Sequence, residues 1–555
     1  MNKKVCSFPI LFALLALLIG TCAVVFPASA QAAPTSTGSI TVSGTVASSY
    51  DAYQIFSANV VDGDSDAKIA TDLAWANDAA RDAALPVLHS AGMPNSQTTA
   101  QEAAEWLNTD SHLTSALNAQ LARSLQSSGA EPVALNAGTA AELPCGYWLI
   151  VAKDDAIAQG EAGTAPIMAL VGGSAVSVKP KAAIPKVSKH VLEDSAAAWQ
   201  KAADATVADD LYWRLSATVP AGLTAYDTYT VRFVDTMSAG LDPSKVAASM
   251  RVYVAAGADG GFDAVPTGKD GHADTEPAKG WTDITPQCVT KMAADGTFTV
   301  RTGDLIAVLG GADAFTAGAR VVAVYNAPLS SACSHGIAKG NPNEVYLRYP
   351  RSPFADQSGD AGFTRTPSDD ACAYTWDLAL TKRGSDGDKP LAGAVLSIAD
   401  DRGRTLAADG TWDAEGKATV TTGEDGRVTV SGVDSGKLKV RELKAPKGYT
   451  AFEGARSVTV KAEGLDVDQV AAAKPKLTIT AESPLRADSA DGSTGSLEAS
   501  LINTPTGTPP SITTGGFMPS TGDMAMYAAA AAAVAGAALI VVALLVKRGG
   551  GSHKE

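Results

Sequence analysis

The chain has 555 residues, a formal net charge of −15 and only 6% aromatic residues. An acidic chain without a basic patch is a poor candidate for binding nucleic acid, so we expect no such partner. The length suits about three domains, and six cysteines are too few for a disulfide scaffold.

The N-terminus has the layout of a secretory signal peptide. The basic start MNKK precedes the apolar run FPILFALLALLIGTCAVVF, and small residues occupy positions 28–30. We therefore assign residues 1–30 to a signal peptide and expect the remainder to be exported.

Four cysteines remain once this segment is removed: Cys145, Cys288, Cys333 and Cys372. Among them we favour a disulfide between Cys333 and Cys372. The alternative is that these residues are plain buried thiols.

Residues 31–184 combine two kinds of pattern. The segments GSITVSGTV, GYWLIVAK and GSAVSVKP alternate as strands, whereas DLAWANDAARDAALPVLHSAG and AQEAAEWLNTDSHLTSALNAQLARSL have helical spacing of apolar residues. We expect a first domain that is mainly β with helical insertions.

Two further stretches are rich in short alternating strands. Residues 185–372 contain YWRLSATV, YTVRFVD, RVYVAA, RVVAVYNA and EVYLRY. Residues 373–508 contain WDLALTK, AVLSIAD, RVTVSG, KLKVRELK, SVTVKA, KLTITA and LEASLIN. Such strands, separated by Gly, Asp and Pro turns, predict tandem antiparallel Ig-like β-sandwiches, and the chain as a whole is expected to be mainly β.

The C-terminal region, 509–555, has the composition of a linker and a membrane anchor. TPTGTPPSITTGGF, which begins at residue 504, is a Pro/Gly/Thr linker. The run MYAAAAAAVAGAALIVVALLV is long enough to span a bilayer as a helix. Lys547, Arg548 and Lys554 follow it, which places the tail on the cytoplasmic side.

Signatures of enzymes, cofactors and metals are scarce. None of the six histidines is paired at metal-ligand spacing, and the chain has no G-x-S-x-G motif and no Walker loop. The segment DGDSDAK, at 62–68, lacks the downstream Glu of an EF-hand loop and reads as a solvated acidic turn. We expect a protein that is not an enzyme and that binds no cofactor or metal.

In the last strand-rich stretch, three polar residues fall on the apolar phase of a strand. In WDLALTK, the face of Leu378 and Leu380 continues to Lys382, although lysine is rarely buried without a partner. The same parity leads KLKVRELK to Glu442 and LEASLIN to Asn503. One domain is therefore predicted to place an amine, a carboxyl group and an amide in its core.

The middle stretch repeats this order of residues. Lys189 lies on the apolar phase of KVSKHV, Asp235 on that of YTVRFVD, and Asn343 on that of NPNEVYLRY. Asn341 shares the parity of Asn343 and is the alternative amide. The plainer interpretation of each residue is a hydrogen-bonded polar group of the core.

These segments resemble the major (backbone) pilins of Gram-positive bacteria, which contain CnaA- and CnaB-type domains. VRELKAPKGYT is similar to the E-box of that family, and LTKRGSDGDKPLAGA to the opening strand and turn of a CnaB domain. FVDTMSAGLD and GNPNEVYLRYP resemble the Asp and Asn segments of the middle domain. FMPSTGD resembles an LPXTG-like sorting signal, with Met518 in place of Leu, and implies sortase cleavage between Thr521 and Gly522.

The resemblance also implies intramolecular Lys–Asn isopeptide bonds. The bonded pairs would be Lys382 with Asn503 and Lys189 with Asn343, and the catalytic carboxyl groups would be those of Glu442 and Asp235. Burial favours a neutral amine, which can attack the amide, and a protonated carboxyl group, which polarises it. The alternative in each case is a buried ion pair beside an incidental Asn.

The first domain departs from this pattern, because SYDAYQIF carries Asp51 where related pilins often have Lys. We therefore expect no isopeptide bond there. VSVKPK resembles the pilin motif V-x-V-Y-P-K, with Lys179 in place of Tyr. This match implies that Lys181 accepts the acyl group of Thr521 from the next subunit, and Lys186 is the alternative acceptor.

The resemblance thus implies a pilus backbone subunit, joined head-to-tail by sortase and supporting adhesion. Its expected partners are identical subunits, sortase, peptidoglycan, and also minor pilins and host surface ligands. Its expected location is the cell wall of a Gram-positive bacterium, after transient anchoring in the membrane. The alternative function is a wall-anchored adhesin or a minor or tip pilin with the same domains.

Overall fold

The computed structural model describes residues 36–507, apart from 65–66, 110, 181–183, 208, 222, 258–261, 263–279 and 408–410. The expected signal peptide, sorting signal and apolar C-terminal span lie outside these residues. Among the helices in the described part of the chain, none has both the length and the apolar character that a membrane crossing requires.

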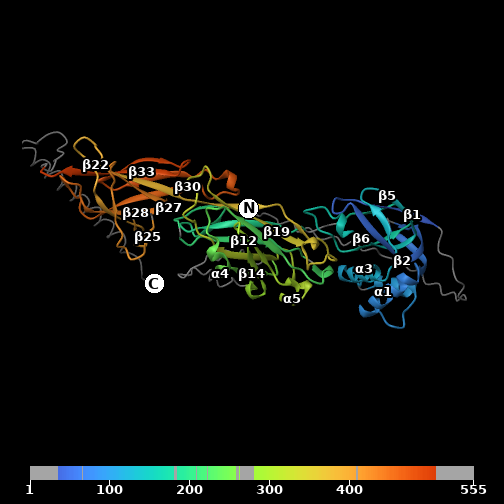
Figure 1. Cartoon of the computed structure of the whole chain (residues 1–555). Coiled ribbons are helices and arrows are strands. Elements are labelled where there is room, and N and C mark those ends of the chain that lie inside the picture. Colours follow the sequence, from blue (N-terminus) through green and yellow to red (C-terminus); the bar gives the residue numbers. More distant parts are fainter. Residues whose placement is uncertain are drawn as a thin grey trace, which may run out of the picture.

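The described strands form six sheets, which fall into three successive pairs along the chain. Figure 1 shows these pairs as three bodies in a row, from the blue N-terminal stretch through the green middle to the orange and red C-terminal stretch. The expected mainly β fold is confirmed. We propose that the three pairs correspond to the three domains inferred from the sequence, and we name them the first, middle and third domains.

The first domain consists of one central sheet covered on both faces. The sheet has the order β3-β2-β6-β7, with β4 beside β2; helices cover one face, and the small sheet β5-β1-β8 covers the other. Its elements are β1 (Thr37–Val42), β2 (Ser49–Asp62), β3 (Lys68–Trp75), α1 (Asp78–Ser90), α2 (Ala100–Asn108), α3 (Ser115–Ser127), β4 (Val133–Asn136), β5 (Ala140–Pro144), β6 (Gly146–Ala152), β7 (Ile167–Val171) and β8 (Val176–Val178).

The helices of this domain begin at side-chain caps that the sequence encodes locally. Asn77 accepts a hydrogen bond from the first turn of α1, and Thr114 does so for α3. Thr99 and Glu102 form a reciprocal capping box at α2. The helical insertions are thus confirmed, with one correction: residues 72–75 of the expected helical segment belong to β3, which pairs with β2.

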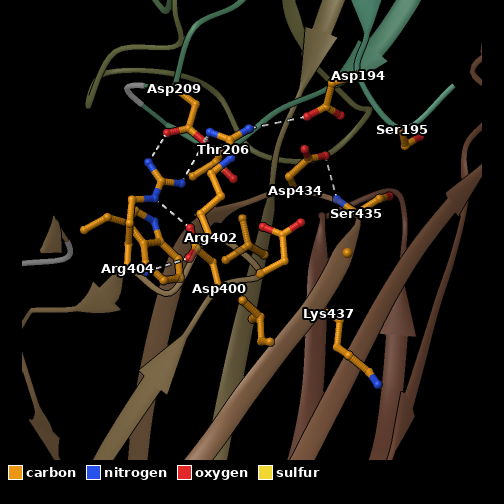
Figure 2. Close-up of a pocket in the computed structure, with 15 residues that line it drawn as sticks. Asp194, Ser195, Thr206, Asp209, Asp400, Arg402, Arg404, Asp434, Ser435 and Lys437 are labelled. Atoms are coloured by element: carbon orange, nitrogen blue, oxygen red, sulfur yellow. Dashed lines mark hydrogen bonds and ion pairs between the residues drawn. The ribbon is translucent and has the colours of Figure 1, made fainter. Parts of the chain in front are cut away.

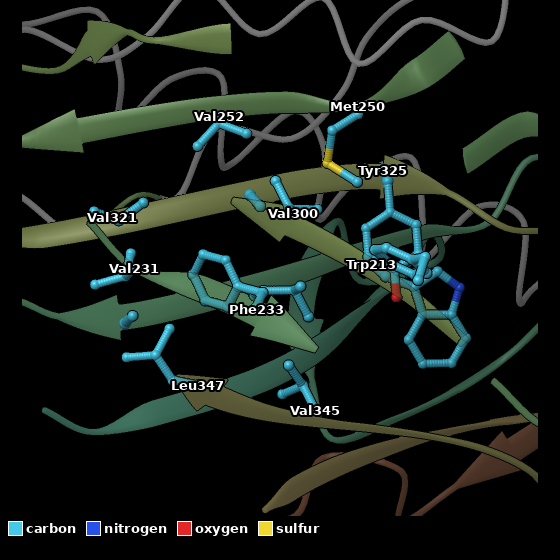
Figure 3. Close-up of a cluster of buried hydrophobic side chains, with 14 of the residues drawn as sticks. Trp213, Val231, Phe233, Met250, Val252, Val300, Val321, Tyr325, Val345 and Leu347 are labelled. Atoms are coloured by element: carbon cyan, nitrogen blue, oxygen red, sulfur yellow. The ribbon is translucent and has the colours of Figure 1, made fainter. Parts of the chain in front are cut away.

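The middle domain is a β-sandwich of two sheets around one apolar core. The sheets have the orders β10-β9-β12-β18-β14-β15 and β11-β21-β19-β13-β17-β16, with β20 beside β19. Figure 3 shows part of the core between them, including Trp213, Phe233 and Tyr325. The elements are β9 (Val187–Glu193), β10 (Ala198–Gln200), β11 (Ala202–Asp204), β12 (Tyr212–Thr218), β13 (Arg232–Met237), α4 (Val246–Ser249), β14 (Arg251–Ala255), β15 (Thr282–Asp283), β16 (Val289–Met292), β17 (Thr297–Arg301), α5 (Leu305–Val308), β18 (Arg320–Asn326), β19 (Asn341–Pro350), β20 (Phe363–Arg365) and β21 (Asp369–Tyr374).

The third domain is a second sandwich. One sheet has the order β27-β22-β33-β29, with β32 beside β33; the other has the order β25-β24-β23-β28-β30-β31, with β26 beside β23. The elements are β22 (Trp376–Gly384), β23 (Val395–Ala399), β24 (Thr405–Leu406), β25 (Trp412–Asp413), β26 (Val420–Thr421), β27 (Arg427–Val433), β28 (Gly436–Lys444), β29 (Tyr449–Thr450), β30 (Ala455–Glu463), β31 (Lys476–Ala481), β32 (Leu485–Asp491) and β33 (Ser496–Pro505). Its first strand, β22, and its last strand, β33, are parallel neighbours.

Direct hydrogen bonds join the middle and third domains. The carboxylate of Asp204, at the end of β11, accepts from the indole Nε1 of Trp376 at 2.6 Å. The same oxygen accepts from the backbone N and the Oγ of Ser435, at 2.9 and 2.6 Å. Because Asp204 is almost fully buried, these donors compensate for its loss of water.

Ion pairs extend this junction (Figure 2). The guanidinium group of Arg404 contacts the carboxylates of Asp209 and Asp400, with Nε 2.7 Å from Asp400 Oδ2. Arg402 also contacts Asp209, at 2.9 Å, but its side chain is 55% exposed, whereas that of Arg404 is 21% exposed. Arg404 is therefore the better shielded of the two links.

We predict that Arg404→Ala loosens the junction between the middle and third domains. The substitution removes the ion pair of Arg404 with Asp209, which crosses the junction, and hydrogen bonds to a charged group are worth about 1.5–3 kcal/mol. Small-angle X-ray scattering should show a broader distribution of intramolecular distances. Arg402→Ala is the matched control and should have a smaller effect, because exposed ion pairs contribute about 0–1 kcal/mol. Scattering curves for Arg404→Ala that superimpose on those of the native chain would contradict this account.

Candidate functional site

The third domain brings Lys382, Glu442 and Asn503 together in its core. Lys382 lies on β22 and Asn503 on β33, two parallel strands of one sheet, and Glu442 reaches them from β28 of the opposite sheet. Their exposed fractions are 1%, 6% and 2%, respectively. The burial that strand parity predicted for these three residues is therefore observed.

The contacts within this group place the amide beside the carboxyl group. Asn503 Nδ2 lies 2.9 and 3.0 Å from the two carboxyl oxygens of Glu442. Lys382 Nζ lies 3.7 Å from Glu442 Oε1 and donates to the backbone carbonyl of Leu501 at 3.1 Å. Among the hydrogen bonds of the described residues, Asn503 Oδ1 has no partner. This oxygen belongs to the carbonyl group that the amine would attack.

Burial changes the acid–base state of the lysine. Removal of water lowers the pKa of Lys382 to about 8, although the nearby Glu442 carboxylate acts in the opposite direction. With a pKa of about 8, about a tenth of the amine is unprotonated at pH 7, far more than for an exposed lysine. Only the unprotonated amine has the lone pair that a nucleophile needs.

The middle domain assembles a second group from both sheets of its sandwich. Lys189 lies on β9 of one sheet, while Asp235 on β13 and Asn343 on β19 belong to the other. All three residues have an exposed fraction of 0%. Lys189 Nζ donates directly to Asp235 Oδ2, and the amine lies 5.5 Å from the ring centroids of both Trp213 and Tyr325.

Burial shifts the pKa values of both the amine and the acid in this group towards their neutral forms. Burial lowers the pKa of Lys189 to about 8, against the opposing effect of Asp235. Burial likewise raises the pKa of Asp235, against the opposing effects of Lys189 and Tyr325. Asn343 Oδ1 and Asp235 Oδ1 both lack a hydrogen-bond partner among the described residues. A proton on the carboxyl group would give it a hydrogen to donate.

The two candidate amides of the middle domain have different surroundings. The Asn341 side chain is held by backbone groups: its Nδ2 donates to the carbonyls of Ser334 and Ala373, and its Oδ1 accepts from Ser334 N at 2.8 Å. Asn343 Nδ2 instead donates to the hydroxyl of Tyr325, which also contacts Lys189. The geometry therefore favours Asn343 as the reacting amide and gives Asn341 a structural role.

Each group contains the parts needed for amide exchange. A neutral lysine amine can attack the Asn carbonyl carbon while a protonated carboxyl group polarises the carbonyl oxygen. Release of ammonia would leave a Lys–Asn isopeptide bond. The carboxyl group regains its proton, so each domain would be both the catalyst and the substrate of a reaction that occurs once.

The strands that would be linked differ from the expectation in the middle domain. An isopeptide bond that carries load along the chain is expected to link the first strand of a sandwich to its last. The third domain fits this expectation, because β22 and β33 are neighbours. In the middle domain Lys189 is on the first strand, but β20 and β21 follow Asn343. That expectation is therefore wrong for this domain, because β21 adds to the edge of β19 and prolongs the sheet.

The first domain places its lysines differently. Asp51 lies on β2, and its carboxylate is 3.4 Å from the half-exposed amine of Lys153. Lys179 and Lys186 are exposed, and Pro180 between them is buried. Lys181, the expected acceptor for polymerisation, lies outside the described residues, as do Thr521 and Gly522.

The cysteines of the described residues are all free thiols. Cys145 and Cys372 are buried, while Cys288 and Cys333 are half-buried. The disulfide expected between Cys333 and Cys372 is not formed in this structure. Burial raises the pKa of the Cys372 thiol to about 11, so the thiolate needed for disulfide exchange is scarce. The alternative of plain thiols describes this arrangement better.

Sequence reasoning missed Tyr325, which contacts both Lys189 and Asp235. A signal was present, because Val321, Ala323 and Tyr325 share one face of RVVAVYNA. That alternation predicts that Tyr325 is buried, but it does not predict which polar groups contact its hydroxyl.

Comparison with known proteins gives a match over part of the sequence. Residues 377–474 match the model of the SpaA family, described as a prealbumin-like fold domain. The chain is also 32% identical over 120 residues to the trypsin-resistant surface T6 protein of Streptococcus pyogenes serotype M6. That alignment covers 20% of each chain, so it spans about a fifth of the length of the curated relative.

The chain also aligns with solved structures of pilins. The T6 backbone pilin of serotype M6 Streptococcus pyogenes aligns with a TM-score of 0.46 and 17% identity, over 85% of this chain and 98% of its own. The full-length major pilin SpaD of Corynebacterium diphtheriae aligns with a TM-score of 0.41 and 15% identity, over the same shares.

We predict different outcomes for the two asparagines of the middle domain. Asn343→Ala should abolish the Lys189 cross-link, and the intact mass should then lack one ammonia loss of about 17 Da. Asn341→Ala is the matched control and should keep that loss. It should nevertheless destabilise the domain by about 1–3 kcal/mol, because backbone groups lose their partners. Intact mass and peptide mapping check both, and a cross-link to Asn341 in the native chain would contradict the assignment.

Proposed function

We propose that the chain is the structural backbone subunit of a covalently polymerised pilus on a Gram-positive cell. The proposal depends above all on one observation: two sandwich domains each bury a lysine, a carboxyl group and an asparagine in one polar cluster. In the third domain Glu442 contacts both other members, and in the middle domain the Tyr325 hydroxyl connects them. Covalent cross-linking of its own domains suits a fibre under tension better than it suits a soluble enzyme. The family match over residues 377–474 supports the same assignment.

Two intramolecular isopeptide bonds form part of this proposal. In the third domain Lys382 bonds to Asn503 with Glu442 as the catalytic carboxyl group. In the middle domain Lys189 bonds to Asn343 with Asp235 in that role. The chain acts on itself and on no separate substrate, so we propose no enzymatic function for the assembled subunit.

Polymerisation requires a second, external reaction. We propose that sortase cleaves between Thr521 and Gly522 and transfers the Thr521 acyl group to Lys181 of the next subunit. Lys181 would follow β8, an edge strand of the small sheet in the first domain. The linker expected from residue 504 begins later than predicted, because Thr504 and Pro505 belong to β33 and pair with β29. The remaining residues up to 521 can extend some tens of ångströms, at about 3.3 Å per residue. Head-to-tail joining through two different surfaces does not close, so it yields a fibre.

The remaining partners follow from this role. Sortase and peptidoglycan act during assembly and anchoring, and identical subunits form the shaft. Minor pilins and host surface ligands are further partners of such a fibre. The mature protein would be anchored to the cell wall after the C-terminal apolar segment has held it transiently in the membrane.

We predict that Lys181→Ala abolishes covalent polymers and leaves folding and secretion intact. The substitution removes only the nucleophile that accepts the Thr521 acyl group. Cells that express the chain with its cognate sortase should show a boiled, SDS-resistant ladder for the native protein and only monomer for the variant.

Lys179→Ala and Lys186→Ala are the matched controls, because both remove a lysine near the same boundary, and both should keep the ladder. Mass spectrometry of the junction peptide identifies the acceptor directly. A junction at Lys186 or Lys179 would contradict the assignment of Lys181 and keep the pilus proposal. A native protein that forms no ladder would instead favour the wall-anchored adhesin.

A further inference from the structure

One hydroxyl group contacts all three members of the buried group in the middle domain. Tyr325 accepts hydrogen bonds from Lys189 Nζ at 2.9 Å and from Asn343 Nδ2 at 2.8 Å. It donates to Asp235 Oδ2 at 3.0 Å. A tyrosine hydroxyl has one hydrogen to donate and two lone pairs to accept. Its full hydrogen-bonding capacity is thus used by the three reacting residues.

The position of Tyr325 is fixed by the sandwich core. The residue lies on β18, in the sheet that also contains β9 and Lys189, and its exposed fraction is 0%. Its ring packs edge-on against Phe298, with centroids 4.9 Å apart. Figure 3 shows the ring beside Trp213, among apolar side chains of both sheets. The hydroxyl therefore reaches across the core to Asp235 and Asn343 on the facing sheet.

In the third domain, the carboxyl group contacts the asparagine amide directly and no tyrosine hydroxyl is described between them. There the carboxyl group of Glu442 lies 2.9 and 3.0 Å from the Asn503 amide nitrogen. In the middle domain no hydrogen bond between Asp235 and Asn343 is found among the described contacts, and Tyr325 bridges the two. Aspartate is one methylene shorter than glutamate. Asp235 and Tyr325 together thus occupy the position that Glu442 alone occupies in the third domain.

We propose that Tyr325 is a catalytic residue of cross-linking in the middle domain, where it orients the Asn343 amide and relays a proton from Lys189 to the leaving nitrogen. The inference depends on the isopeptide reaction proposed above. The donation from Asn343 Nδ2 to Tyr325 fixes which end of the amide faces the hydroxyl, so Oδ1 points elsewhere and remains available to a protonated Asp235.

The proton transfers balance. Neutral Lys189 Nζ attacks Asn343 Cγ and forms the new C–N bond, while Asp235 gives its proton to the carbonyl oxygen. Tyr325 then gives its proton to Nδ2 and takes one from Nζ. The C–Nδ2 bond breaks and ammonia leaves. The proton on the carbonyl oxygen returns to Asp235, and both catalytic groups are restored.

The hydroxyl stays protonated for this role. Burial, reinforced by the nearby Asp235 carboxylate, raises the pKa of Tyr325 well above its usual value. The group therefore remains a neutral hydroxyl, able to donate and accept at the same time, throughout the physiological pH range.

Tyr325→Phe tests this inference in the full secreted chain. The variant keeps the ring and its packing and removes only the oxygen. Cells are pulse-labelled, and the Lys189–Asn343 peptide is quantified against time after synthesis. We expect cross-linking in the middle domain to slow by roughly 10²-fold or more, the usual contribution of a general acid–base group. The bond of the third domain, in the same molecules, should form at the native rate.

Tyr349→Phe is the matched control. Tyr349 is equally buried, but its hydroxyl donates to Gly160 O at 2.8 Å, far from the reacting groups in the hydrogen-bond network. Its middle-domain bond should form at the native rate. The double variant Asp235→Glu/Tyr325→Phe supplies a longer acid, like Glu442, and should regain much of the lost rate. A purely structural role of the hydroxyl would give no such rescue.

The outcomes separate this inference from the function on which it depends. A native chain without a Lys189–Asn343 linkage would overturn both the isopeptide proposal for this domain and the role of Tyr325. A native chain with the linkage, and a Tyr325→Phe variant that cross-links at the same rate, would overturn the role of Tyr325 alone. A double variant no faster than Tyr325→Phe would also contradict proton transfer by the hydroxyl.

Discussion

The exclusion of water from a lysine amine is the constraint on which the other features of both sites depend. Lys189 and Lys382 have exposed fractions of 0% and 1%. A charged ammonium group in such a place is strongly disfavoured unless a partner is present, so each sandwich must supply a carboxyl group beside it. The same dry surroundings lower the pKa of both lysines and raise the pKa of Asp235. In the proposed reaction, the buried amine and carboxyl group would act as a nucleophile and a general acid beside an amide, and would not remain an unfavourable ion pair.

The proposed isopeptide bonds would link different strands in the two domains, so the two domains would respond differently to force. In the third domain the link would join β22 to β33, so force on the chain ends would load a covalent bond. Hydrogen bonds contribute only about 1 kcal/mol each, whereas closure of a long loop by a disulfide is worth roughly 4–5 kcal/mol in the entropic model. In the middle domain the link would join the two sheets and leave β20 and β21 outside the closed loop. The last strand there is held by its ladders with β19 and β11, and by the ion pair of Lys201 with Asp369.

Alternation of apolar residues was sufficient to predict the strands of both sandwiches and the burial of Lys382, Glu442 and Asn503, because strand parity determines which face a side chain occupies. The helices of the first domain were likewise visible in their spacing. Strand parity could not distinguish Asn341 from Asn343, because residues two apart share a face of the sheet. The two side chains differ in their hydrogen-bond partners, which parity does not predict. Parity also could not reveal Tyr325, whose three contacts depend on the register of strands that are distant in sequence. Residues 72–75, the start of the first expected helical segment, instead belong to β3, because pairing with β2 outweighs local helical spacing.

The intact mass of the secreted native chain, measured after reduction, tests the central claim most directly. Each isopeptide bond expels one ammonia, so two bonds predict a mass roughly 34 Da below that of the mature sequence. Peptide mapping of the same sample should locate the losses at Lys189 with Asn343 and at Lys382 with Asn503. A mass equal to that of the uncross-linked sequence would show that the buried groups are ordinary ion pairs and would contradict the account.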